Sequence, residues 1–331
     1  MTGREAHPRL RKVIGVDLGG TKLLGGVVDE HLEVHARLLR TVHGMKQEEL
    51  IDAVVSAVEE LRASVPDVDA VGFGIPSLID QTTGIAVIAV NLDLHDVPFR
   101  DVMKERLRLP VFIDNDGNVT TLVETRFGAA QGASDVVGLT IGTGIGGGLV
   151  LNDRLYRGHW GAGAELGHMV VDEDGPRCQG NCPNRGCLEA VASGTALGRE
   201  GLVAAEEEPD SDLGRALAGD QHITGALVTT LALGGDEVSR MVLGHVGRLL
   251  GVGLSSISNI FNPEVIVIGG GAMAAGDLLL EPAREELRAR GLRPNRDQLR
   301  VVPAKFGPDA GMLGAAVMAL DELEVTASST A

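Results

Sequence analysis

Two segments of this chain share one pattern, in which an apolar run leads into a glycine-rich turn and continues into a second apolar run. They cover residues 13–28 and 136–151, and a shift of 123 positions aligns Gly15 with Gly138 and Gly19 with Gly142. Each segment is typical of a β-hairpin, because glycine tolerates the backbone angles of a tight turn. The alternative is two unrelated glycine-turn hairpins. A chain of 331 residues is long enough for two domains, and the two segments lie where those two domains would start, which favours two related α/β domains.

The remaining sequence alternates helical and strand patterns, as expected for an α/β fold. Apolar periodicity predicts helices over about 47–64, 118–127, 195–205, 236–260, 281–290 and 312–320, and strands over about 70–75, 110–114 and 264–268. We place Pro282 in the first turn of its helix and Gly291 just past the end of that helix.

Charge and hydropathy exclude several classes of protein. The net charge of −17 argues against nucleic-acid binding, which needs clustered Lys and Arg. The hydrophobic fraction of 44% argues against disorder. The longest charge-free run, 136–152, is interrupted by glycines and is shorter than the roughly 20 apolar residues of a membrane span. Residues 1–12 are polar and lack the apolar centre of a signal peptide, so we expect a cytoplasmic protein without a membrane partner.

Three glycine clusters follow predicted strands. The backbone N–H groups of such loops can point at one anion without obstruction by a Cβ atom. The alternative is tight hairpins that need glycine only for its positive φ. The first two clusters match neither the Walker pattern nor the dinucleotide fingerprint. Three clusters at strand ends nevertheless favour a nucleotide site, with Asp17 placed to hold Mg²⁺. The residues assigned to this site are Asp17, Gly19, Gly20, Thr21, Lys22, Gly142, Thr143, Gly144, Gly269, Gly270 and Gly271.

A polar cluster, residues 114–118, lies between a predicted strand and a predicted helix. One interpretation is an N-cap, in which Asp116 or Asn118 binds the free N–H groups of the first helical turn. That role explains one polar residue but not a whole cluster. A carboxylate at a strand end beside a nucleotide could instead accept the proton of an attacking hydroxyl group.

One histidine and three cysteines form a second candidate site. His168, Cys178, Cys182 and Cys187 are the donor set of a closed tetrahedral Zn²⁺ site, and the segment between them is rich in Gly and Pro. Three buried free thiols are the alternative. Four ligands leave no open position, so the expected role of the metal is structural. Glu165 and Glu189 lie close by in sequence and are candidates to bind a polyol, with solvated surface carboxylates as the alternative.

Six motifs occur together in one order: Val-Asp-Leu-Gly-Gly-Thr-Lys (16–22), Asp-Asn-Asp-Gly-Asn (114–118), Ile-Gly-Thr-Gly-Ile-Gly-Gly-Gly (141–148), Gly-Ala-Glu-Leu-Gly-His (163–168), Cys-Pro-Asn-Arg-Gly-Cys-Leu-Glu (182–189) and Val-Ile-Gly-Gly-Gly (267–271). On these motifs, about residues 12 to 322 resemble the ROK family, which includes repressors and kinases, and are most similar to its bacterial glucokinases. The resemblance implies an actin-like ATPase (ribonuclease H-like) fold with two α/β domains around a cleft. Residues 1–117 with about 310–325 would form the N-terminal domain, and 118–309 the larger domain.

The resemblance also implies ATP, Mg²⁺ and structural Zn²⁺ as cofactors, a sugar as substrate, and a homo-oligomer, either a dimer or a tetramer. The expected reaction is phosphorylation of a hexose, glucose at its 6-hydroxyl, with Asp116 as the catalytic base. The sugar would be bound by Asn91, Asn115, Asp116, Glu165, His168 and Glu189, and zinc by His168, Cys178, Cys182 and Cys187. The glycine loops would bind the phosphates, with Gly269 to Gly271 on the adenosine side.

Two alternatives stay open on the sequence. An N-acetylhexosamine kinase, for N-acetylmannosamine or N-acetylglucosamine, would show the same motifs. A sugar-responsive regulator would carry a helix-turn-helix module before the first glycine loop, whereas the first strand here is expected near residue 12. The cysteine spacing also departs from the usual Cys-x-Cys-Gly-x-x-Gly-Cys of the family, because Gln179, Gly180 and Asn181 separate Cys178 from Cys182.

Overall fold

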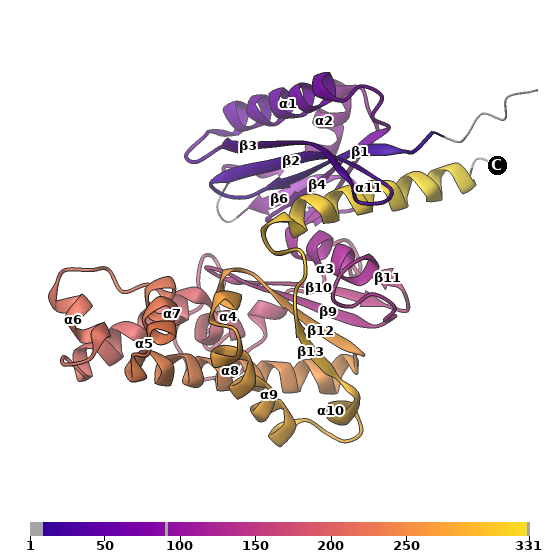
Figure 1. Ribbon diagram of the computed structural model, residues 1–331. Helices are drawn as coiled ribbons and strands as arrows, with labels where there is room; N and C mark the ends of the chain where they lie inside the picture. The colour runs from indigo at the N-terminus through magenta and orange to yellow at the C-terminus, as the bar shows by residue number, and fades with distance from the viewer. Residues whose placement is uncertain (1–8, 90–91, 330–331) are drawn as a thin grey trace, which may run out of the picture. The chain divides into compact units, whose positions relative to one another are not determined.

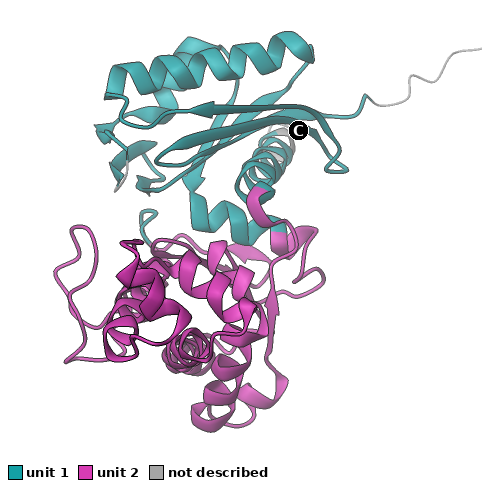
Figure 2. Cartoon of the chain, turned by 60° about the vertical axis from the view of Figure 1, so that its left-hand side comes forward, with its two compact units in different colours: residues 1–123, 159–162, 309–331 teal, residues 124–158, 163–308 magenta. Residues whose placement is uncertain are grey.

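The computed structural model describes residues 9–89 and 92–329. The chain forms two compact units, shown in different colours in Figure 2. Unit 1 contains residues 1–123, 159–162 and 309–331, and unit 2 contains residues 124–158 and 163–308. The mixed α/β class predicted from the sequence is confirmed in both units.

Unit 1 is built on a five-stranded sheet whose strand order is β3-β2-β1-β4-β8. Its strands are β1 (Lys12–Leu18), β2 (Lys22–Asp29), β3 (Val34–Thr41), β4 (Ala70–Ile75) and β8 (Val111–Asn115). The first three strands pair antiparallel, while β4 pairs parallel to both β1 and β8. The carboxyl ends of β1, β4 and β8 therefore lie at one edge of the sheet.

Helices cover both faces of this sheet, with α1 (Gln47–Ser64) and α11 (Ala310–Ser329) on opposite sides (Figure 1). A Cβ atom at Gly72 of β4 would lie 1.9 Å from the Ala315 carbonyl oxygen, so glycine there lets α11 approach the strand closely. The unit is completed by α2 (Phe99–Leu107) and by a small sheet of β5 (Ser77–Asp80), β6 (Ile85–Ala89) and β7 (His95–Val97). Helix α3 (Asp116–Arg126) begins in unit 1 and ends in unit 2.

Unit 2 repeats the sheet of unit 1. Its order is β11-β10-β9-β12-β13, from strands β9 (Val136–Ile141), β10 (Ile145–Leu151), β11 (Arg154–Leu155), β12 (Val265–Gly269) and β13 (Arg300–Pro303). The order and directions match those of unit 1, which agrees with the predicted duplication. The hairpin loops differ by one residue: Leu18 pairs with Leu23 across 19–22, but Ile141 pairs with Ile145 across 142–144. The shift of 123 therefore aligns the first strand of each hairpin and not the second.

Helix α8 (Glu237–Phe261) forms the centre of the apolar core of unit 2, where Val246, Leu250 and Leu254 are fully buried. Within the described part of the chain it is the one helix long and apolar enough to cross a membrane, but 61% of its apolar window is buried inside the molecule. The other helices of this unit are α4 (Leu188–Ala192), α5 (Gly194–Glu207), α6 (Asp212–Ala218), α7 (Gly225–Gly234), α9 (Asp277–Arg290) and α10 (Asn295–Gln298), with the 3-10 turns η1 (Leu166–His168) and η2 (Gly271–Ala275) and, at the junction with α11, η3 (Gly307–Asp309).

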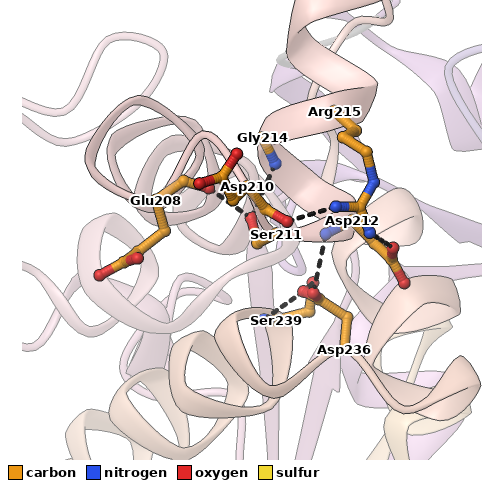
Figure 3. A network of polar contacts seen from close by, with 8 residues as sticks. All are labelled: Glu208, Asp210, Ser211, Asp212, Gly214, Arg215, Asp236 and Ser239. Carbon is orange, nitrogen blue, oxygen red and sulfur yellow. Dashed lines mark hydrogen bonds and ion pairs between the residues drawn. The ribbon is translucent and has the colours of Figure 1, made fainter.

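The start of α8 is fixed by a network of polar contacts (Figure 3). Asp236 caps α8 by accepting hydrogen bonds from the Ser239 N–H at 2.8 Å and the Ser239 hydroxyl at 2.6 Å. It also accepts a bond from the N–H of Asp212, the first residue of α6, at 3.0 Å. Burial acts to raise the pKa of Asp236, but these hydrogen bonds outweigh it, so the pKa lies below its usual value.

Two predicted helix bounds are wrong. Helix α9 begins at Asp277 rather than Glu281, so Pro282 lies inside the helix and not in its first turn. Proline costs α9 one backbone hydrogen bond, which burial of Leu279 and Leu280 offsets. Helix α11, expected over about 312–320, runs from Ala310 to Ser329.

Candidate active site

The first glycine loop joins β1 to β2. The Gly19 N–H donates to the Lys22 carbonyl oxygen at 2.9 Å and closes the turn, while the Thr21 carbonyl accepts from the Val42 N–H at 3.0 Å. Thr21 and Lys22 are exposed. The loop can therefore offer a hydroxyl group and a positive charge to an anion.

Asp17 lies beside this loop, in a row that crosses the sheet. It pairs with Gly74 of β4, and Gly74 pairs with Asp114 of β8. Burial, and then the nearby charge of Asp116, raise the pKa of Asp17 to about 7. A divalent cation between these two carboxylates would offset the charge of Asp116 that Asp17 experiences.

The polar cluster at 114–118 lies at the junction of β8 and α3. Asn115, rather than the expected Asp116 or Asn118, caps the helix most fully, because its Oδ1 accepts from the Gly117 N–H at 2.8 Å and the Asn118 N–H at 3.4 Å. The Asn115 amide also donates to the Ser77 carbonyl oxygen at 3.3 Å. The buried Asp114 carboxylate accepts from the Asn118 amide at 2.8 Å. The cluster therefore organises the turn in which Asp116 is held.

Asp116 is the first residue of α3, and its carboxylate accepts a hydrogen bond from the Gly117 N–H at 2.9 Å. Burial raises the pKa of this carboxyl group, and the hydrogen bonds from Gly117 and Asn115 only partly oppose that effect. A raised pKa makes the ionised carboxylate a better proton acceptor, as a general base requires.

The second glycine loop, in unit 2, borders a cavity of about 920 Å³. Gly142 and Thr143 line this cavity, together with residues of α5 and α7 and with Gly271 of the third glycine cluster. Gly269 ends β12, and Gly270 turns the chain with a φ of 89°. The cavity lining is mostly small and apolar, with hydroxyl groups of threonine among it, which suits the base and ribose of a nucleotide.

The four predicted zinc ligands lie together. One ligand atom from each of His168, Cys178, Cys182 and Cys187 can be chosen so that all four lie within 4.8 Å of one another. Cys178 Sγ is 3.4 Å from His168 Nδ1, and the Cys182 and Cys187 sulfurs are 3.8 Å apart. Burial raises the pKa of the Cys178 thiol above its usual value. A bound Zn²⁺ would hold these thiols as thiolates, and a three-sulfur, one-nitrogen donor set fits that ion.

The two candidate glutamates differ in their surroundings. Glu165 is exposed, and its Oε2 lies 4.0 Å from His168 Nε2. Glu189 is partly buried, accepts from the Ile145 N–H at 2.8 Å, and is 3.7 Å from Cys178 Sγ. Glu189 is therefore not a freely solvated side chain, since it joins the cysteine cluster to the hairpin of the second glycine loop.

The site residues fall into two groups. Asp17, the first loop, Asn115 and Asp116 belong to unit 1, whereas the second loop, the third glycine cluster, Glu165, Glu189 and the four zinc-ligand candidates belong to unit 2. Asn91, predicted to bind the sugar, lies outside the described residues.

Two residues that the sequence reasoning missed are Gly311, which lies against Asp17, and Gln179, which contacts the second loop. No local sequence signal marks either of them.

Comparison with known proteins gives consistent matches over nearly the whole chain. The model of the ROK family matches residues 13–322. A glucokinase from Thermotoga maritima is 39% identical, covering 93% of this chain and 97% of that protein, and one from Streptomyces coelicolor is 34% identical, covering 92% and 96%. A crystal structure of a ROK family glucokinase from Streptomyces griseus, in complex with glucose and AMPPNP, has a TM-score of 0.82 at 35% identity and covers 94% of this chain and 99% of that chain.

Proposed function

The chain belongs to the ROK family, and from this premise we propose that it is an ATP-dependent kinase that phosphorylates glucose at its 6-hydroxyl group. The expected actin-like ATPase fold is confirmed by its structural relatives. The observation that carries the proposal is identity of 34–39% to glucokinases over almost their full length. Cytoplasmic location and a homo-oligomeric state stay predictions.

Asp116 is our candidate for the general base. Its carboxylate is held at the start of α3 by the Gly117 N–H, and burial raises its pKa. It would accept the proton of the sugar 6-hydroxyl as that oxygen attacks the γ-phosphorus of ATP. A positioned base of this kind typically contributes roughly 10²–10⁴-fold in rate.

The glycine loops are our candidates for binding the triphosphate. Among the described residues, the N–H groups of Thr143 and Gly144 have no hydrogen-bond partner, so they are available to phosphate oxygens. Asp17 would hold Mg²⁺, directly or through water. When bound, this ion neutralises charge on the transferring phosphoryl group. Lys22 would add a positive charge from the first loop.

His168, Cys178, Cys182 and Cys187 would hold a structural Zn²⁺. The ion supplies cross-links to a segment that has little regular structure of its own. Glu165, Glu189 and Asn115 are our candidates for hydrogen bonds to sugar hydroxyl groups, together with Asn91.

A coupled assay with Mg²⁺·ATP over a panel of hexoses and N-acetylhexosamines tests the proposal. We expect glucose to have the highest kcat/KM, and mass spectrometry of the product to show one added phosphate at the 6-position. A higher kcat/KM for N-acetylmannosamine or N-acetylglucosamine would instead favour the hexosamine kinase. Turnover of no sugar in the panel by the folded protein would contradict kinase activity.

A further inference from the structure

We propose that Gln179 is a positioning residue that orients the second glycine loop for nucleotide phosphates and thereby couples the cysteine cluster to nucleotide affinity. This inference rests on the proposed function, since it takes the cavity beside Thr143 to be the nucleotide site. Gln179 lies between Cys178 and Cys182, in the three-residue segment that makes the spacing of these cysteines longer than is usual in the family.

The contacts of Gln179 converge on the loop. Its Nε2 donates to the Thr143 carbonyl oxygen at 3.2 Å and to Ser193 Oγ at 3.1 Å. The Thr195 hydroxyl donates to the same carbonyl at 2.8 Å. Ser193 is the N-cap of α5 and accepts from the Ala196 N–H at 3.2 Å. The Thr143 carbonyl is therefore held from two directions, by the start of α5 and by the cysteine-containing segment.

Holding this carbonyl also fixes the orientation of an N–H group that can donate a hydrogen bond to a phosphate oxygen. The Thr143 carbonyl and the Gly144 N–H belong to one planar trans peptide, so they point in opposite directions. With the oxygen bound to Gln179 and Thr195, the Gly144 N–H is directed away from both side chains. In the described chain this N–H has no partner of its own. A preoriented, unpaired N–H is what an anion-binding loop needs, because no free energy is then spent on ordering it during binding.

The position of Gln179 depends in turn on the cysteine cluster. Cys178, its neighbour, has its sulfur 3.4 Å from His168 Nδ1, and its N–H donates to the Asn184 carbonyl oxygen at 3.0 Å. A metal bound to Cys178 would restrict this segment and lower the entropy cost of placing Gln179 on Thr143. Glutamine also suits the place chemically, because it donates a hydrogen bond without adding negative charge near a polyphosphate.

The test replaces Gln179 by methionine, which has a similar length and no donor. Asn181→Ala is the matched control, since Asn181 lies in the same segment, is exposed, and has no hydrogen bond to the described chain. Titration calorimetry with Mg²⁺·AMPPNP, without sugar, measures nucleotide affinity. Loss of one or two neutral hydrogen bonds predicts about 3–10-fold weaker binding for Q179M and unchanged binding for N181A. The KM for ATP should rise by the same factor, while kcat and the KM for glucose stay within about twofold.

Zinc content by elemental analysis is the second readout and should be the same in wild type and Q179M. Removing zinc from the wild type should weaken AMPPNP binding by a similar factor. Removing zinc from Q179M should weaken AMPPNP binding only slightly further, because the contact that zinc supports is already lost. Wild-type affinity in Q179M, or an equal loss in N181A, would overturn the positioning role. If zinc removal weakened AMPPNP binding by the same factor in the wild type and in Q179M, the coupling between the cysteine cluster and nucleotide affinity would be overturned. If AMPPNP binding responds as expected but glucose is not phosphorylated, the proposed function fails and the positioning role stands.

Discussion

The carboxylate of Asp17 lies against the backbone of Gly311, where a Cβ atom would come 2.5 Å from Asp17 Cγ. The two residues belong to β1 and to the first turn of α11, at opposite ends of the chain. Only glycine lets the helix begin this close to the carboxylate.

Gly311→Ala should therefore displace Asp17. Overpacking of this kind costs about 1–3 kcal/mol of stability. A shift of about 1 Å in a metal-binding carboxylate can lower kcat by roughly 10²-fold. Kinetics against Mg²⁺ concentration, with thermal unfolding, measure both effects. Gly244→Ala is the control, because the one atom near its added Cβ is the end of the Arg248 side chain at 3.7 Å. Full activity of G311A at low Mg²⁺ would contradict the role given to Asp17.

Asp116→Asn should abolish turnover and preserve sugar binding. The amide keeps the size of the side chain but cannot accept the hydroxyl proton, so we expect kcat to fall by about 10²–10⁴-fold. Glucose binding can be followed by the fluorescence of Trp160, the one tryptophan of the chain. The Trp160 carbonyl accepts from the Gln81 N–H, and the Gln81 amide donates to the carbonyl of Ile113, two positions before Asn115. A D116N variant with kcat within tenfold of wild type would rule out Asp116 as the base.

Asp236→Ala should destabilise the protein in a pH-dependent way. The variant loses the cap of α8 and an acceptor for α6, which predicts a cost of about 0.5–2 kcal/mol at pH 7. The pKa of Asp236 is lower in the folded than in the unfolded protein. Its charge therefore adds to the free energy of unfolding above the unfolded-state pKa of about 3.9, and this addition is lost as the pH falls through the folded-state pKa. Urea unfolding should show the largest difference from wild type at pH 7 and a smaller one below about pH 4. Glu208→Gln, on an exposed side chain nearby, should change little (Figure 3). A difference independent of pH would contradict the charge contribution.

Cys178→Ser should lower zinc occupancy as strongly as Cys182→Ser. The Cys178 sulfur lies among the other donors despite its spacing in the sequence, so we expect it to be the fourth ligand. Elemental analysis of freshly reduced protein should give about one zinc per chain for wild type, because four donors complete a structural site. Full zinc occupancy in C178S would show that Cys178 is not a ligand, and absence of zinc from the wild type would refute the site.

Local signals in the sequence were sufficient for much of the fold. Helix α1 and strand β4 have the bounds expected from their apolar spacing, because a helix or strand that packs on one core must repeat its buried positions at the period of its backbone. The expected start of α9 was wrong, because a contact in the core outweighs a local signal there. Packing of Leu279 and Leu280 in the core outweighs the preference of proline for a first turn, and a turn signal cannot report such packing.

The sequence by itself determined the family, the glycine loops, the chemistry of the candidate donor atoms in the cysteine cluster and the choice of Asp116 as candidate base, because these depend on residue chemistry at short spacing. Only the tertiary structure decided that Asn115 caps α3, that Glu189 joins the cluster to Ile145, that Gln179 holds Thr143 and that Gly311 makes room for Asp17. Each of the last three pairs joins segments far apart in the chain. Such contacts depend on how complete elements pack against one another, and no spacing within a single element encodes that arrangement.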